Sequence, residues 1–403
     1  MDRDTPLPSP GSPVACFGEA LRLGLGAFGG PVAHIGHFER HYVRRLGWID
    51  GADFAGLVAL CQLVPGPSSS QLGYLIGYRR AGLAGAMAAW AGFTLPSALT
   101  MAMLGLLLRQ AGTMPAPLLA IVAGLQIVTV AVVAQAVLAM ARGLCRTVQT
   151  RLVALTGFAL ALLLPAGWGQ IAVLAAGGAL GAIVLREGVA GASVRRVVPA
   201  RAGRVAIVLL AVGGLAAMAL PAAGGHGLAT LLALLARSGA LVFGGGHVVL
   251  PLLDAALVPG QWIDRASFLA GYGAAQVMPG PLFTFGAFIG AMAAPAGASQ
   301  ALALWWALAA LVALFAPGLL IATAILPLWH ALAHHPVARA SMAGINAAVV
   351  GLLAAVLAGS VAPASLHRPL DAVVALAALA LLLHGRLPVI AVIALTVAAR
   401  CAV

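Results

Sequence analysis

Two Pro-Gly-Pro sequences are places where the backbone itself could bind a ligand. They are Pro65-Gly66-Pro67 and Pro279-Gly280-Pro281, and each interrupts an apolar stretch. Proline removes a backbone donor and glycine adds freedom, so each cluster is expected to stop a helix. Ser68-Ser69-Ser70 follows the first turn and Thr284 lies after the second, and such hydroxyls favour a helix start. The free N–H groups and positive dipole end of a helix that starts there can bind an anion without a charged side chain.

Two glycine clusters predict a second pair of helix breaks. They are Gly29-Gly30-Pro31 and Gly244-Gly245-Gly246. Together with the two turns they give four broken helix ends, which could surround one small anion. The alternative is that glycine and proline only kink or tighten membrane helices. Because the breaks recur in register, we favour the binding interpretation.

Polar side chains flank these breaks. Arg22 and Arg237 lie a turn or two before the glycine clusters. An arginine in a membrane helix costs at least about 2.5–3.5 kcal/mol on insertion scales, so it should face a cavity or a partner. We interpret both as anion contacts, with snorkelling to the interface, or pairing of Arg22 with Glu19, as the alternative. Gln62 and Gln276 precede the Pro-Gly-Pro turns and either bind the ligand or satisfy the broken backbone.

Three histidines, His34, His37 and His41, fall on one face of a predicted helix, with Glu39 alongside. A metal site, a proton-titrating role for His34 or Glu39, and a solvated face are the alternatives. The second half of the chain has no matching cluster, so we predict no metal. Asp50 and Asp264 each follow Trp-Ile and are predicted helix N-caps.

The composition is that of an all-α polytopic membrane protein. Of 403 residues, 62% are apolar and 8% are charged, whereas a soluble domain carries about three times that charged fraction. The net charge of +12 comes from arginines in short loops, the positive-inside pattern rather than a nucleic-acid surface. The four cysteines form no C-x-x-C pair. Without nucleotide, metalloprotease or nucleophile-elbow motifs, we predict no cofactor and no enzyme activity.

An internal duplication organises the chain, since a shift of 213–215 residues superposes the two halves. The predicted parts are a polar tail (1–13), a first repeat (14–186), a basic linker with an extra span (187–226) and a second repeat (227–403). The matched positions are Arg22 and Arg237, Gly24 and Gly239, Phe28-Gly29-Gly30 and Phe243-Gly244-Gly245, Trp48-Ile49-Asp50 and Trp262-Ile263-Asp264, Phe54 and Phe268, Gln62 and Gln276, the two Pro-Gly-Pro turns, and Ile76-Gly77 and Ile289-Gly290. Phe93 and Pro96 correspond loosely to Phe315 and Pro317.

Each repeat is expected to contribute four long apolar stretches. They are 82–108, 115–141, 152–165 and 170–185 in the first repeat, and 298–326, 337–360, 370–384 and 387–402 in the second. A further span at 205–221 links the repeats.

The segments 50–63 and 68–78 are each too short to span a bilayer, which takes about 20 residues. They form either one kinked span or a re-entrant hairpin with its tip at the turn. A hairpin puts Arg79-Arg80 on the cytoplasmic side with Arg40, Arg44 and Arg45. The stretches LLDAALVPGQWID and AMAAPAGAS, which flank the matching hairpin of the second repeat, contain no basic residue, as expected on the outer side. We therefore predict two re-entrant hairpins in inverted repeats, a recurring transporter plan.

The motifs resemble those of the chromate ion transporter family, in its long-chain, two-domain form. They are FGGPVAHIGHFERHYVRRLGWID, QLVPGP, IGYRRAGLAGA and FTLPSAL in the first repeat, and FGGGHVVLPLL and QVMPGP in the second. The resemblance implies that Phe28–Pro31, His34, Trp48, Pro65–Pro67 and their second-repeat matches form the family motif. It also implies a multi-pass inner-membrane carrier that exports chromate and confers resistance, with sulfate as competitor or alternative substrate.

Three function classes remain open at this stage. A secondary transporter that moves an oxyanion outward is the leading hypothesis. An anion channel, or a carrier of sulfate or another inorganic anion, is the alternative. A membrane scaffold or sensor leaves the duplicated breaks unexplained. The expected partners are the oxyanion and the lipid bilayer, and the sequence does not decide whether the chain forms a homodimer.

Overall fold

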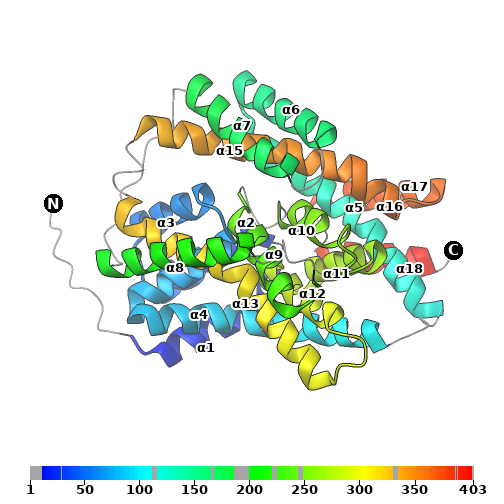
Figure 1. The fold of residues 1–403 in the computed structure, drawn as a ribbon, viewed down its shortest axis with the longest axis horizontal. Helices are drawn as coiled ribbons and strands as arrows, with labels where there is room; N and C mark the ends of the chain where they lie inside the picture. The colour runs from blue at the N-terminus through cyan, green and yellow to red at the C-terminus, as the bar shows by residue number, and fades with distance from the viewer. Residues whose placement is uncertain are drawn as a thin grey trace.

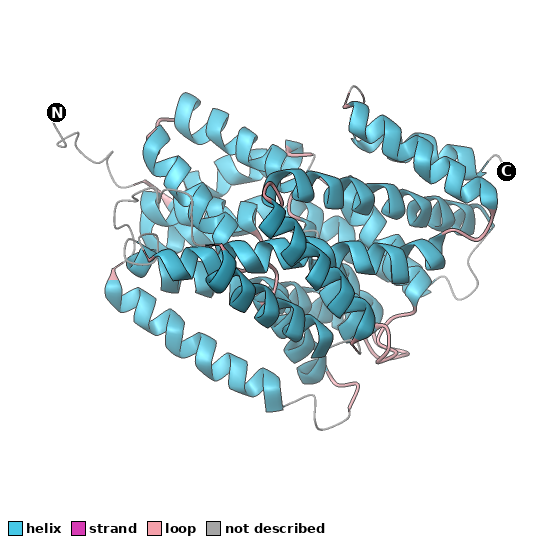
Figure 2. Ribbon diagram, turned by 90° about the horizontal axis from the view of Figure 1, so that it is seen from above, coloured by secondary structure: helices cyan, strands magenta, loops and turns pink. Residues whose placement is uncertain are grey.

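The computed structural model describes residues 11–28, 30–110, 116–164, 168–185, 199–219, 225–243, 248–329, 335–385, 387 and 389–401. Every regular element within these residues is a helix (Figures 1 and 2). Five of the helices are long and apolar enough to cross a membrane. The chain is therefore an all-α, multi-pass membrane protein, as its composition predicts.

The first repeat contains the elements α1 (Pro13–Gly26), α2 (Gly30–Phe38), the π-helical segment η1 (Glu39–Arg45), α3 (Gly51–Leu63), α4 (Ser68–Gln110), α5 (Ala116–Leu144), α6 (Val148–Leu163) and α7 (Trp168–Val184). Helix α8 (Ala200–Ala219) links the repeats. Most of its apolar side chains are exposed, as expected for a helix that faces lipid.

The second repeat contains α9 (Leu228–Ala240), α10 (Val249–Leu257), α11 (Arg265–Val277), the 3₁₀ turn η4 (Leu282–Thr284), α12 (Phe285–Ala293), α13 (Gln300–Ile325), η5 (Leu326–Leu328), α15 (Pro336–Val356), the π-helical η6 (Leu357–Val361), α16 (Ala362–Ser365), α17 (Pro369–His384) and α18 (Val389–Cys401). The apolar stretches expected from the sequence correspond to these helices in both repeats.

Helix α3 and the first part of α4 form a hairpin whose tip is Pro65-Gly66-Pro67. The two ends of the hairpin meet, because an Arg79 Nη1 atom lies 2.5 Å from Asp53 Oδ2. Beyond Arg80 the long helix α4 reverses at Ala81 and Gly82, where the backbone leaves helical geometry. The chain therefore enters and leaves this hairpin at the same end, as a re-entrant hairpin requires. Its depth in the bilayer and the inversion of the second repeat stay predictions.

The backbone repeats its left-handed turns at matched positions. Positive φ angles of 59° at Gly47, 130° at Gly66 and 62° at Gly82 recur as 58° at Gln261, 109° at Gly280 and 75° at Gly297. Each pair is separated by 214 or 215 residues, the spacing of the sequence duplication. The two repeats thus share their turns as well as their motifs.

The repeats interlock through their later helices. Helix α15 of the second repeat packs against α6 and α7 of the first, and α5 of the first packs against α17 and α18 of the second (Figure 1). Backbones meet closely where α15 crosses α6 and α7, since a Cβ would clash at Gly157, Gly181, Gly344 and Gly351. Small residues permit such close helix packing in membranes.

Candidate functional site

The first Pro-Gly-Pro turn rests on the second repeat. The backbone N–H of Gly66 donates a hydrogen bond to the carbonyl oxygen of Val242 at 2.7 Å. Val242 lies just before the second glycine cluster. A Cβ on Gly66 would lie 2.8 Å from the Cα of Gly318, so the turn approaches the backbone of α13 beside Pro317. Glycine is needed here both for its φ angle and for this close approach.

The second turn makes the reciprocal contacts with the first repeat. The N–H of Gly280 donates to the carbonyl oxygen of Ala27 at 2.9 Å, just before the first glycine cluster. A Cβ on Gly280 would meet Ser97 Oγ at 2.8 Å and the Phe93 carbonyl oxygen at 3.2 Å, beside Pro96 of α4. Each turn therefore lies against the broken segment and the proline-containing helix of the other repeat, as a two-fold axis between the repeats produces.

Gln71 fixes the first turn to α13. Its side-chain amide nitrogen donates to the carbonyl oxygens of Pro65 and Gly318, at 2.8 Å each. Both partners accept only, so they identify this amide atom as the nitrogen. The amide oxygen of Gln71 is buried and has no hydrogen-bond partner within the described residues.

His34 joins the two turns through a chain of hydrogen bonds. Its Nδ1 atom lies 3.2 Å from Ser69 Oγ, and its Nε2 atom lies 3.0 Å from the carbonyl oxygen of Ala27. A carbonyl can only accept, so Nε2 carries the proton, and in the neutral ring Nδ1 accepts from the Ser69 hydroxyl. Because the Ala27 oxygen also accepts from Gly280, the chain runs from Ser69 to the second turn.

The surroundings of the first turn are polar but uncharged. The side chains of Ser68, Ser69, Ser70 and Gln71, which follow the turn, are all buried, as are Thr94 and Ser97 further along α4, where Ser97 lies against the second turn. The hydroxyls of Ser70 and Thr94 have no hydrogen-bond partner within the described residues. A buried hydroxyl without a partner costs about 1–3 kcal/mol, so these groups are suited to hydrogen-bond a ligand.

Among the described residues, those that follow the second turn form no comparable polar set, although Ser97 of the first repeat lies against this turn. Leu282, Phe283 and Phe285 follow it and are buried, and the Thr284 hydroxyl donates to the carbonyl oxygen of Pro281. The helix after this turn begins with a 3₁₀ turn, whereas α4 begins directly at Ser68. The two predicted helix starts therefore differ: the start of α4 is polar, whereas η4 and the start of α12 are largely apolar.

The structure brings together part of the predicted site. The two turns (Pro65–Pro67 and Pro279–Pro281), Ser69 and His34 share the contacts described above, and Ser68 is buried next to Ser69. Gly30 and Pro31 open α2, so the first predicted break is present, while Gly29 and the second cluster, Gly244, Gly245 and Gly246, lie outside the described residues. Gln62 is exposed, and Gln276 is hydrogen-bonded to the buried Tyr272 hydroxyl.

The two predicted arginines lie apart from this buried set. Arg22 is 65% exposed, and its guanidinium pairs with Glu19 at 2.8 Å, the alternative that the sequence leaves open. Arg237 is also exposed. Glu19 further accepts a hydrogen bond from His41 Nε2 at 2.9 Å. We therefore leave both arginines out of the contact set proposed below.

The remaining predictions concern caps and histidines. Asp50 accepts from the N–H of Asp53, and Asp264 accepts from the N–H of Ser267, so both N-cap predictions are confirmed. A solvated helix face does not describe His34, which is 1% exposed. The described residues contain no group of three potential metal ligands.

Sequence reasoning misses three residues of the buried set: Gln71, Thr94 and Ser97. The sequence offers Gln62 either as a ligand contact or as support for the broken backbone, and the structure gives the support role to Gln71. Thr94 and Ser97 are polar residues within a long apolar run of α4, and Gln71 directly follows the three serines. The position of Thr94 and Ser97 in an apolar run is the signal that could have identified them, because unpaired polar groups are avoided in hydrocarbon.

Broken helices that meet inside a multi-pass, all-helical protein are characteristic of membrane transporters. The comparison with known proteins gives the particular family. The family model described as chromate transporter matches residues 14–182 and 229–401. The chain belongs to the chromate transporter family, whose members are transporters rather than enzymes.

Curated relatives match along most of this chain. A chromate transport protein of Pseudomonas aeruginosa is 29% identical over 361 residues, which cover 87% of this chain and 81% of that protein. A probable chromate transport protein of Synechococcus elongatus is 26% identical over 277 residues, covering 68% and 67%. An uncharacterised transporter of Methanocaldococcus jannaschii is 25% identical over 348 residues, covering 86% and 83%. No solved structure matches the chain.

Proposed function

We propose that the protein is a secondary carrier that exports chromate across the inner membrane and so confers chromate resistance. Membership of the family supports the substrate class. A dianion that leaves a negative cell interior gains about 2.3 kcal/mol per charge per 100 mV, so the membrane potential can drive export without a nucleotide. Sulfate, a tetrahedral dianion of the same shape, is the expected competitor.

The observation that carries this proposal is the polar, uncharged surroundings of the first turn. The anion would bind at the N-terminus of α4, where the first N–H groups of the helix carry about half a positive charge. Ser70 would donate its unpartnered hydroxyl to it. Binding by dipoles rather than by a fixed cation leaves the anion able to depart, as a transport cycle needs.

Reciprocal bracing supports a carrier over a channel. Each turn is bonded to the broken segment of the other repeat, through Gly66 to Val242 and through Gly280 to Ala27. A shift of one hairpin therefore moves its neighbour, which suits two alternating states. A freely conducting pore gains nothing from such coupling.

The test is labelled chromate flux into inside-out vesicles that contain the full chain. Potential and pH gradient are imposed separately, with sulfate as competitor. We expect saturable flux that follows the potential and is inhibited by sulfate. Non-saturating conductance would instead identify a channel, and flux of sulfate without chromate would overturn the substrate assignment.

A further inference from the structure

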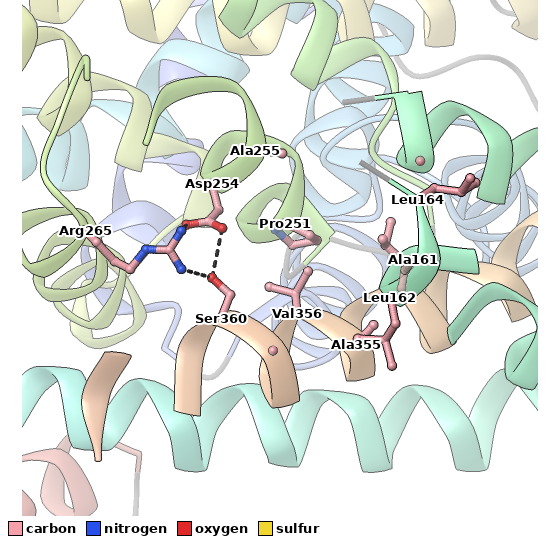
Figure 3. Close-up of a pocket in the computed structure, with 13 residues that line it drawn as sticks. Ala161, Leu162, Leu164, Pro251, Asp254, Ala255, Arg265, Ala355, Val356 and Ser360 are labelled. Atoms are coloured by element: carbon pink, nitrogen blue, oxygen red, sulfur yellow. Dashed lines mark hydrogen bonds and ion pairs between the residues drawn. The ribbon is translucent and has the colours of Figure 1, made fainter. Parts of the chain in front are cut away.

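A cavity of about 270 Å³ lies between the repeats and shares no lining residue with the buried set around the turns. Its walls come from α6 and α7 on one side and from α10, α11 and α15 with η6 on the other (Figure 3). At about 30 Å³ per water in the liquid, it has room for a small anion and several waters. Most of its lining is apolar, for example Leu162, Leu164 and Val356.

Three polar side chains converge in one part of this lining: Asp254, Arg265 and Ser360 (Figure 3). The Ser360 hydroxyl donates to Asp254 Oδ2 at 2.9 Å, and Arg265 Nη1 donates to the Ser360 hydroxyl oxygen. Arg265 Nη2 lies 3.6 Å from Asp254 Oδ1, and that oxygen has no hydrogen bond within the described residues. The ion pair is therefore bridged by Ser360 and lacks the direct two-bond geometry of a strong arginine–carboxylate pair.

The accessible member of this cluster is the cation. The Arg265 side chain is 38% exposed, whereas the Asp254 side chain is 13% exposed. Ser360 belongs to the π-helical segment Leu357–Val361, and single π-helical turns within α-helices are frequent at functional sites. A ligand that enters the cavity therefore meets a guanidinium and a hydroxyl before it meets the carboxylate.

We propose that this cavity is a second oxyanion site, in which Arg265 and Ser360 bind one tetrahedral anion and Asp254 is the internal competitor that occupies them when the anion is absent. This inference rests on the proposed transport of an oxyanion. The planar guanidinium matches two oxygens of a tetrahedral anion, and the hydroxyl donates to a third. The carboxylate repels the anion, so each entering anion must displace Asp254 from Arg265 and Ser360.

A lipid phosphate offers the same chemistry as a free oxyanion, and the apolar lining would suit an acyl chain. We commit to the free anion, because the turn site that it must reach lies in the same molecule. Binding is therefore measured on the delipidated full chain in detergent, with radiolabelled sulfate as the probe. A parallel arm adds a short-chain phosphatidylglycerol as competitor.

The variants are Arg265→Gln, Asp254→Asn and a matched control, Arg400→Gln. Arg400 pairs with Asp371 at 3.7 Å, a similar ion pair whose residues do not line the cavity. We expect the native chain and the control to bind two sulfates, and Arg265→Gln to bind one. Asp254→Asn removes the competitor and should bind the second sulfate at least tenfold more tightly. If Arg265→Gln does not fold, Arg265→Lys is the substitute test. It keeps the positive charge but lacks the planar guanidinium, so we expect it to weaken sulfate binding at the second site.

The outcomes separate this inference from the proposed function. Two sulfates bound by Arg265→Gln, or weaker binding in Asp254→Asn, would overturn the second site. A single sulfate that is lost in Gly66→Ala but kept in Arg265→Gln would also overturn it, and would leave the proposed function standing. Binding of phosphatidylglycerol that depends on Arg265 and excludes sulfate would identify a lipid site instead. A chain that binds neither sulfate nor chromate would overturn both proposals.

Discussion

The imidazole of His34 and the hydroxyl of Ser69 lie 3.2 Å apart in the buried interior of the first repeat. This contact joins the helix that follows the first glycine break to the helix that follows the first Pro-Gly-Pro turn. Since His34 also donates to Ala27, which accepts from Gly280, both turns belong to one hydrogen-bonded unit. Substitutions at His34 should therefore affect the geometry of both Pro-Gly-Pro turns.

Replacement of His34 by alanine should lower both stability and chromate flux. It leaves the buried Ser69 hydroxyl without a partner, at a cost of about 1–3 kcal/mol. Ser69→Ala should cost less, and the double variant should be less destabilised than the sum of the two, with a coupling of about 0.5–3 kcal/mol. Thermal unfolding and vesicle flux measure these effects. His37→Ala is the control, and additive single effects would contradict the coupling.

Gly66→Ala should abolish flux at matched expression. The φ angle of 130° is strained for alanine, and the new Cβ would clash with both Gln71 and Gly318. Gly36→Ala is the matched control, because nothing lies within 4 Å of a Cβ at that helical glycine. Normal flux from Gly66→Ala would show that the turn does not need its present geometry.

The hairpin should depend on the buried pair of Asp53 and Arg79. Arg79→Gln leaves a buried carboxylate without its cation, which costs about 3–5 kcal/mol when such a pair is broken. The double variant Asp53→Asn/Arg79→Gln should recover much of the loss, because neither charge remains. Arg44→Gln breaks the exposed pair with Glu39 and should change stability by less than about 1 kcal/mol. Equal unfolding temperatures for Arg79→Gln and Arg44→Gln would contradict this account.

Cysteine labelling can decide the membrane topology. Gly51, Gly82 and Gly297 are exposed positions where a new side chain meets no neighbour, and the positive φ angles at Gly82 and Gly297 make cysteine there strained by about 1–3 kcal/mol. In a chain without its native cysteines, an impermeant thiol reagent should label Gly51→Cys and Gly82→Cys from one side of the membrane. Gly297→Cys should be labelled from the other side. Opposite labelling of the first two would support a kinked span, and labelling of all three from one side would contradict the inverted arrangement.

The double variant Arg22→Gln/Arg237→Gln should keep most of its flux, within about twofold of the native chain. Both arginines are exposed, and Arg22 already pairs with Glu19, an exposed pair worth about 0–1 kcal/mol. Flux is measured as maximum rate and apparent affinity separately. A loss of affinity without a loss of folded protein would return both arginines to the anion path.

The helix boundaries and the hairpin follow from local chemistry, which is why the sequence predicts them. Pro67 and the serines after it start α4, and Asp50 and Asp264 cap α3 and α11. Both ends of a re-entrant hairpin lie on the same side of the membrane, where basic residues collect. The position of Arg79 at one end could therefore also be predicted. Each of these features depends on residues close together in the chain or on the sidedness of charge.

The contacts between the two repeats around the Pro-Gly-Pro turns could not be predicted in the same way. Gln71 and Gly318 are 247 residues apart, and the bond between them exists only because α4 and α13 cross at this point. The sequence does show that the second turn is followed by apolar residues, namely Leu282, Phe283 and Phe285. The duplication of Pro-Gly-Pro nevertheless suggested two similar helix starts, because a repeated backbone motif does not report on the side chains around it.

The interlocking of α5 with α17 and α18, and of α15 with α6 and α7, has a consequence for how this architecture arose. Within the described residues, each repeat has apolar helix faces that its counterpart covers. A half-length ancestor would therefore have assembled as a pair of identical chains before its gene was duplicated and joined. Fusion then freed the two halves to diverge, so that one could keep its hydroxyls while the other filled the equivalent space with aromatic rings.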